Sequence, residues 1–231
     1  MKNKIKLFFS LILFKPTGTW SLRKSLWFNF RYLPFCQAIH LPVLLSRNVE
    51  VKYCRKNSIE FMGGVKYGIL QIGYCDNDIY YSNKSAINIK GTIRIHGTGM
   101  HFFGAGLNLT IKEGAILEIG NNFAVSVDAR INVAKRISIG NDNMWSYGNT
   151  IMDNDSHPIY DSSGNQINHH RDVVFGNKVW MACHCIILKG ADIPDGSIIA
   201  AGSIISKTSA INNAIMTSNG RVIKEDVMWK R

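Results

Sequence analysis

Apolar residues in the C-terminal part of the chain recur at every sixth position. The lead residues of these hexads are Phe175, Met181, Ile187, Ile193, Ile199 and Ile205. Their fifth positions are all small: Val179, Cys185, Ala191, Ser197 and Ser203. An amphipathic helix places apolar residues three and four apart, and an amphipathic strand places them two apart, so neither explains this period. A triangular coil of three short strands does explain it, with lead side chains inside and small side chains at the corners.

The same period occurs upstream with changes of frame. One frame contains Ile119, Val125, Ile131 and Ile137, and a second contains Ile139, Trp145 and Ile151. We therefore predict stacked coils of about three hexads over residues 59–206, interrupted by a loop at 152–172. The nonrepetitive segments 1–58 and 207–231 are expected to cover the two open ends, the first of them in partly helical form.

Three segments of the chain resemble the hexapeptide-repeat acyltransferases. The tract GNKVWMACHCIILKGADIPDGSIIAAGSIISK is similar to the acetyl-CoA-binding end of galactoside, maltose and polysaccharide O-acetyltransferases. The ending SNGRVIKEDVMWKR and the stretch MDNDSHPIYD resemble the tail and the Asp-x-Asp-x-His loop of the polysaccharide branch. The resemblance implies an all-β fold, a left-handed parallel β-helix, whose handedness the period alone does not reveal.

In that family the loop that interrupts the coils carries a catalytic histidine, and this resemblance points to His157. A neutral imidazole is suited to take the proton of a sugar hydroxyl as the hydroxyl attacks a thioester. Asp153 or Asp155 is expected to fix the ring tautomer, and the spacing does not distinguish them. An exposed turn residue is the alternative interpretation of His157.

The resemblance also implies a site for acetyl-CoA as cosubstrate near the C-terminal coils. The residues carried over are Trp180, Cys183, Ala201, Ser206, Lys207 and Arg221, with Lys224 as a further basic candidate. The three cations supply positive charge for the phosphates of CoA. Cys185 falls on a small-residue position and is expected in the core.

No metal is expected, although related γ-class carbonic anhydrases bind zinc on a similar fold. The histidines available for such a site are His96, His101, His157, His169, His170 and His184. Their spacing does not assemble a convincing ligand set. A zinc hydratase therefore ranks below the transferase as an interpretation, and a noncatalytic β-helix scaffold is a further alternative.

Charge and cysteine content constrain partners and compartment. The 231-residue chain has 27 Lys and Arg against 16 Asp and Glu, a formal net charge of +11, which favours polyanionic partners. Nucleic acid is not expected, because no nucleic-acid-binding signature occurs. Residues 1–35 combine aromatic, apolar and basic side chains, which fits either a peripheral membrane contact or a cap on the coils. Five cysteines and no evident cleavable signal peptide favour the cytoplasm, including the inner face of its membrane.

These observations predict an acetyl-CoA-dependent O-acetyltransferase that modifies a sugar hydroxyl in capsule, lipopolysaccharide or exopolysaccharide biosynthesis. The family resemblance implies a homotrimer with active sites between neighbouring subunits. Within the same enzyme class, the alternative acceptor is a small molecule such as serine, a galactoside or an antibiotic.

Overall fold

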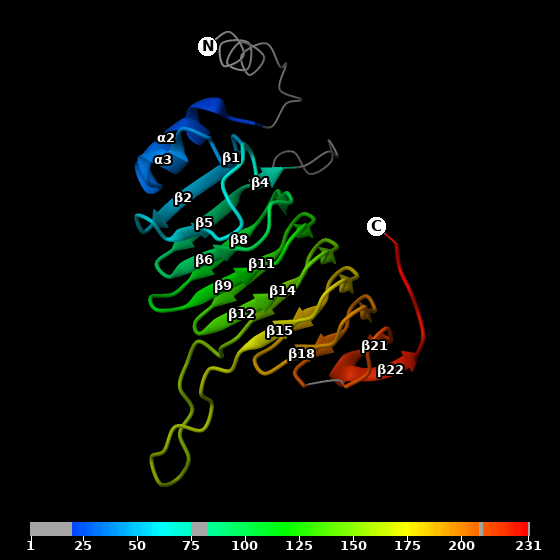
Figure 1. Ribbon diagram of the computed structural model, residues 1–231. Coiled ribbons are helices and arrows are strands. Elements are labelled where there is room, and N and C mark those ends of the chain that lie inside the picture. The colour runs from blue at the N-terminus through cyan, green and yellow to red at the C-terminus, as the bar shows by residue number, and fades with distance from the viewer. Residues whose placement is uncertain (1–19, 75–82, 208–209, 231) are drawn as a thin grey trace.

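The computed structural model describes residues 20–74, 83–207 and 210–230, and these form a three-sided parallel β-helix with a helical cap (Figure 1). From β1 to β20, successive strands go in turn to three sheets, which we name sheets I, II and III. Every strand pair of the described chain is parallel except β21 with β22. The predicted all-β parallel helix is therefore confirmed.

The described strands have the following bounds. Sheet I contains β1 (Val43–Leu45), β4 (Leu70–Tyr74), β7 (His101–Gly104), β10 (Ala124–Val125), β13 (Met144–Trp145), β16 (Trp180–Met181), β19 (Ile198–Ile199), β21 (Ile215–Thr217) and β22 (Arg221–Lys224). Sheet II contains β2 (Val49–Cys54), β5 (Ser85–Ile89), β8 (Asn108–Ile111), β11 (Arg130–Val133), β14 (Thr150–Met152), β17 (Ile186–Ile187) and β20 (Ile204–Ile205). Sheet III contains β3 (Ile59–Phe61), β6 (Thr92–Ile95), β9 (Ile116–Ile119), β12 (Arg136–Ile139), β15 (Val173–Phe175) and β18 (Asp192–Ile193).

The hexad pattern corresponds directly to strand register in the last coils. Phe175 pairs with Ile193, and Met181 pairs with Ile199, three hexads further on in each case. The lead and fifth positions of these hexads are all buried. In the upstream coils, paired residues such as Leu109 and Ile131 are separated by more than three hexads. The longer upstream coils explain why the six-residue frame shifts there.

An aromatic column fills the middle of the helix. Phe103, Phe123, Trp145 and Phe175 come from consecutive coils, with ring centroids 5.3, 4.8 and 4.6 Å apart. All four side chains are at most 2% exposed. Such close aromatic pairs add stabilisation beyond the burial of their apolar area.

The helix α2 (Leu22–Tyr32) covers the N-terminal end of the coils, next to the short α3 (Phe35–Ala38). The Asn29 side chain donates to the Val43 carbonyl at 2.7 Å and accepts from the Val43 N–H at 3.1 Å. The Ser25 hydroxyl accepts from the Leu45 N–H at 2.9 Å. These side chains provide hydrogen-bond partners for backbone groups of the edge strand β1, which would otherwise be left unpaired under the cap.

The coils extend beyond the predicted range 59–206 at both ends. β1 and β2 already pair with β4 and β5, so the ladders begin at Val43. The prediction placed this start too late because β2 is longer than a hexad strand, and the first coils keep no six-residue frame. At the other end β21 continues sheet I, and β22 turns back along it. The predicted division into domains at residues 58 and 206 remains a prediction.

Candidate active site

The predicted loop leaves the coils where sheet II meets sheet III. β14 ends at Met152 and β15 begins at Val173, and the segment between them projects from the helix (Figure 1). The segment is an ordered hairpin: Ile167 N–H donates to the Ile159 carbonyl at 2.9 Å, and Asp161 N–H donates to the Asn165 carbonyl at 2.9 Å. The segment between the two strands comprises residues 153–172.

His157 lies exposed near the base of this hairpin. Its backbone N–H donates to the Asp155 carbonyl at 2.7 Å, which makes a tight turn at this point. Within the described chain, no hydrogen bond to the His157 imidazole is found. The ring is therefore open to an acceptor, a donor or another subunit.

Asn168, on the returning arm of the hairpin, fixes the backbone around His157. Its Nδ2 donates to the His157 carbonyl at 2.8 Å, and its Oδ1 accepts from the Ile159 N–H at 2.7 Å. Asn168 is only 9% exposed. No pattern in the sequence points to Asn168, because a contact across a long loop leaves no periodic signal. This residue defines the position from which the imidazole projects.

Asp155 ties the same hairpin to the coils. Its Oδ2 accepts from the Lys189 ammonium and, at 2.9 Å, from Asn168 Nδ2. The Lys189 ammonium also donates to the Asn168 carbonyl at 3.1 Å. The hydrogen bond from Lys189 lowers the pKa of Asp155 below its ordinary value, with a further contribution from Asn168. Asp155 thus holds the loop, and its carboxylate is not bonded to the His157 ring here.

Asp153 has a different environment from Asp155. It is fully buried, and its two oxygens accept from the N–H groups of Ala134 and Lys135, both at 2.7 Å. Asn154 Nδ2 also donates to it, at 2.9 Å. These contacts join the root of the loop to the corner of the preceding coil. Neither predicted aspartate contacts the imidazole within the described chain, so a role in orienting the ring stays a prediction.

Two of the predicted CoA residues share the corner between sheets I and II. Cys183 and Ala201 lie on consecutive coils, joined by a 2.9 Å hydrogen bond from Gly202 N–H to the Cys183 carbonyl. Cys183 is half-buried and Ala201 is exposed. Since the His157 loop leaves from the other edge of sheet II, these residues and His157 lie at opposite corners of that sheet.

The remaining predicted CoA residues occupy other parts of the last coils. Ser206 and Lys207 follow β20, at the corner between sheets II and III, while Arg221 and Lys224 lie on β22. Lys207, Arg221 and Lys224 are all exposed. The single chain therefore does not gather the seven residues into one pocket, and it leaves the three cations accessible to an anionic group.

Trp180 is half-buried on sheet I, under the C-terminal tail. Its ring centroid lies 6.3 Å from that of Trp229, whose indole N–H donates to the Lys178 carbonyl at 2.7 Å. The tail is also held by Val227 N–H, which donates to the Asn213 carbonyl at 2.8 Å. Trp229 is a second residue that the sequence analysis did not single out, although it belongs to the family-like ending.

Cys185 and His101, which are candidates for other chemistry, both lie in the core. Cys185 is fully buried, as predicted, and burial raises the pKa of its thiol. His101 is also fully buried, its Nε2 lies 2.8 Å from the Gly120 carbonyl, and burial lowers its pKa. Across the described ranges, no group of three or more His, Cys, Asp or Glu residues is arranged to hold a metal ion.

The chain is similar to curated O-acetyltransferases. The chain is 34% identical over 124 residues to a polysialic acid O-acetyltransferase of Neisseria meningitidis, which covers 50% of this chain and 57% of the relative. It is 31% identical over 113 residues to the galactoside O-acetyltransferase of Escherichia coli (strain K12), covering 48% and 55%. No protein-family model matches. The chain thus spans little more than half the length of these curated relatives.

A solved structure shares the fold over a larger part of the chain. The crystal structure of the polySia-specific acetyltransferase NeuO aligns with a TM-score of 0.55 at 20% identity, covering 82% of this chain and 79% of that one. The β-helix is accordingly the left-handed form that the family resemblance implies. In fold and in about half of its sequence, the chain is similar to the hexapeptide-repeat O-acetyltransferases, which confirms the predicted resemblance.

Proposed function

We propose that the protein is an acetyl-CoA-dependent O-acetyltransferase that modifies a sugar hydroxyl in capsule, lipopolysaccharide or exopolysaccharide biosynthesis. The observation that carries the proposal is the His157 hairpin, a projecting loop with an exposed imidazole and a backbone fixed by Asn168. The likeness to named O-acetyltransferases supports the same reaction.

In the proposed reaction His157 acts as a general base. Its neutral imidazole takes the proton of the sugar hydroxyl while the oxygen attacks the thioester carbonyl of acetyl-CoA. The tetrahedral intermediate then collapses, the C–S bond breaks, and the imidazolium returns the proton to the CoA sulfur. Transfer is direct, so no acyl-cysteine is needed. This agrees with the burial of Cys185 inside the coil.

Acetyl-CoA binding is assigned to the last coils and the tail. Lys207, Arg221 and Lys224 are exposed cations suited to the phosphates of CoA. The small residues Cys183 and Ala201 line one corner, where their short side chains leave room for the pantetheine arm. Trp180, beside Trp229, supplies aromatic surface nearby.

The function is tested by incubating the protein with acetyl-CoA and a panel of saccharides while measuring free CoA. We expect saccharide-dependent CoA release and an acetyl ester on the sugar. A second candidate acceptor is a free galactoside, favoured by the similarity to a galactoside O-acetyltransferase. Binding of acetyl-CoA without transfer to any hydroxyl compound would contradict the proposal, and failure to bind it would favour the scaffold.

The proposal includes a homotrimer with each active site shared by two subunits. Two observations support sharing. The His157 loop and the Cys183–Ala201 corner lie at opposite edges of sheet II, and the loop exposes Ile159, Tyr160 and Ile167 by 52%, 59% and 62%. Exposed apolar side chains on a projecting hairpin suit contact with a neighbouring copy.

Sharing is tested by mixing two inactive variants, His157→Ala and Ala201→Trp, through unfolding and refolding. If sites are shared, random assembly restores about a quarter of the sites, because each then needs one intact loop and one intact neighbour. Mixed assemblies without any recovered activity would contradict sharing.

We place the reaction in the cytoplasm, at the inner face of the membrane. None of the helices in the described ranges is long and apolar enough to cross a membrane. The outer side of the cap nevertheless exposes Trp27, Phe30 and Phe35 by 49%, 50% and 73%. Eight Lys or Arg residues precede the first acidic residue, Glu50. Aromatic side chains within a basic stretch of sequence are suited to an anionic lipid surface, and residues 1–19 of the predicted contact lie outside the described residues.

A further inference from the structure

We propose that the outer face of sheet II, beside its corner with sheet III, binds an acidic saccharide acceptor through the carboxylates of its sugars. This inference rests on the proposed transferase function and goes further, because it names the acceptor class and the residues that select it. The surface lies on the coils upstream of the His157 loop, where family resemblance assigns no residue.

The first observation is a column of cations on consecutive coils. Arg55, Lys90 and Lys112 each follow a strand of sheet II directly: β2, β5 and β8. Their N–H groups donate to equivalent carbonyls of the next coil at 2.8, 2.9 and 2.8 Å. Neighbouring strands lie about 4.8 Å apart, so the three residues form a ladder parallel to the helix axis.

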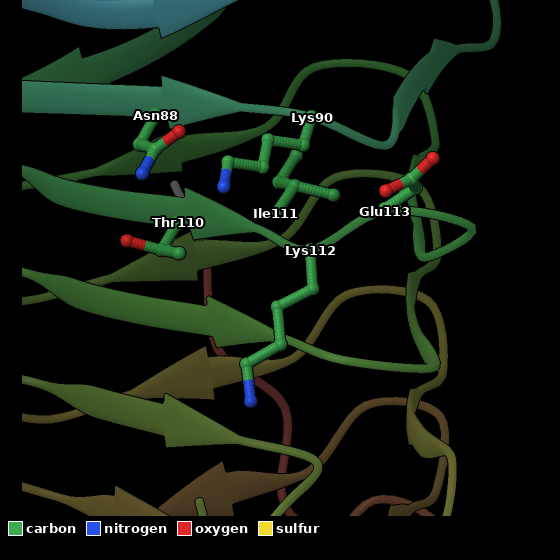
Figure 2. A pocket seen from close by; sticks show the side chains of 6 residues that line it. All are labelled: Asn88, Lys90, Thr110, Ile111, Lys112 and Glu113. Carbon is green, nitrogen blue, oxygen red and sulfur yellow. The ribbon is translucent and has the colours of Figure 1, made fainter.

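These cations lack the acidic partners found elsewhere on the same corner. Lys135 pairs with Asp172 at 2.8 Å, and Lys189 pairs with Asp155. Across the described ranges, Lys90 and Lys112 make no ion pair. Figure 2 shows both lysine side chains extending over the strands, away from Glu113 on the turn. Their positive charge is thus available to an anion lying on the sheet.

The second observation is a row of polar side chains beside the column. Asn88, Thr110 and Asn132 are direct neighbours on β5, β8 and β11. The Oδ1 atoms of Asn88 and Asn132 are buried, yet neither has a hydrogen-bond partner in the described structure. A buried acceptor without a donor is costly, and a sugar hydroxyl or acetamido N–H would satisfy it.

A shallow pocket joins the two features. It has a volume of about 400 Å³ and is lined by Asn88, Lys90, Thr110, Ile111, Lys112 and Glu113 (Figure 2). The combination of ammonium groups with neutral hydrogen-bonding groups suits a carboxylated sugar, whose negative charge and hydroxyls occupy different sides of one ring.

The row leads to the candidate catalytic loop. Asn132 pairs with Met152, the last residue before the loop, so the row from Asn88 to Met152 spans three strand spacings, about 14 Å. A saccharide of several residues that follows the coils would therefore reach the base of the His157 hairpin. This geometry favours a polymeric acceptor over a monosaccharide.

Direct binding tests the inference without requiring turnover. The probes are fluorescently labelled polysialic acid and polygalacturonic acid, which carry one carboxylate per sugar, and neutral dextran of matched length. Single-stranded DNA serves as a polyanion without sugar carboxylates. The variants are Lys90→Gln and Lys112→Gln, and Lys66→Gln removes an exposed cation from the β3–β4 segment as a matched control. Acetyl-CoA affinity is measured in parallel.

We expect an acidic saccharide to bind, dextran and DNA to bind weakly, and each test variant to lose threefold to tenfold in affinity, with Lys66→Gln unchanged. Acetyl-CoA affinity should stay the same in all variants. Equal binding of dextran or DNA, or unchanged saccharide affinity in both variants, would overturn the inference. If the wild type binds saccharide but not acetyl-CoA, the transferase proposal fails while the saccharide surface stands.

Discussion

The Asn168 side chain donates a 2.8 Å hydrogen bond to the carbonyl of His157, across eleven residues of the same hairpin. The bond fixes the backbone that carries the proposed base, while the imidazole itself stays exposed. Asn168 is therefore a positioning residue, and Lys189 and Asp155 anchor it in turn to the coils.

Replacement of Asn168 by Ala should misplace His157 without affecting donor binding. We expect kcat to fall by about 10- to 100-fold, because small displacements of a catalytic group have effects of this size. The KM for acetyl-CoA should stay constant. Asn165→Ala, which alters the exposed tip of the same hairpin, is the matched control. Equal losses of kcat in both variants would mean that any disturbance of the hairpin lowers the rate, and would contradict a specific positioning role for Asn168.

The anchoring of the loop by Asp155 should depend on pH. Lys189 lowers the folded-state pKa of this carboxyl below its ordinary value of 3.8, so ionised Asp155 stabilises the closed loop above that pH. The contribution is lost as pH falls through the lowered pKa. The protection factors of the amides in residues 155–168, which remove the pH dependence of intrinsic hydrogen exchange, should therefore fall in acid. In Asp155→Asn these protection factors should already be low at neutral pH, whereas Asp192→Asn should behave as wild type.

The cap should contribute measurably to stability through Asn29. Its side chain makes two hydrogen bonds to Val43 while fully buried, and removing it leaves both backbone groups of Val43 unpaired at the edge of β1. We expect Asn29→Ala to lower the free energy of unfolding by about 1–3 kcal/mol per unpaired group. Chemical denaturation measures the change, with Arg23→Ala on the exposed side of α2 as control. A difference near zero between the two variants would refute this role.

The exposed side of the cap should bind anionic vesicles. A triple variant, Trp27→Ser with Phe30→Ser and Phe35→Ser, should reduce cosedimentation with phosphatidylglycerol vesicles, and high salt should weaken wild-type binding. Met100→Ser, which changes an apolar side chain 52% exposed on a later coil, should leave binding unchanged. Retained binding of the triple variant would show that another part of the chain makes the contact.

The hexads made the coils predictable because the place of each lead residue in the six-residue period, such as that of Ile187 or Ile199, indicates that its side chain points into the coil. The first coils were missed for the converse reason. β1 is recognised only by its pairing with β4, and its edge is satisfied by Asn29, and neither contact has a signature in local spacing. The start of the helix at Val43 therefore needed the structure.

The candidate site, too, was predictable from the sequence only in part. The break in the period located the loop, and the motif located His157. Asn168 and Lys189 were not predictable, since their roles depend on how the hairpin folds back on itself and onto the coil. In the sequence, Lys90 and Lys112 cannot be distinguished from ordinary surface charges, because only the stacking of the coils places them next to each other.

The most direct test of the account is acetyl transfer by His157→Ala. With a responsive saccharide, the wild type should release CoA and form an acetyl ester, and the variant should lose at least about a hundredfold in kcat, the range of general-base catalysis. Acetyl-CoA affinity and assembly size should be unchanged, which separates chemistry from folding. Wild-type turnover in His157→Ala would contradict the central claim.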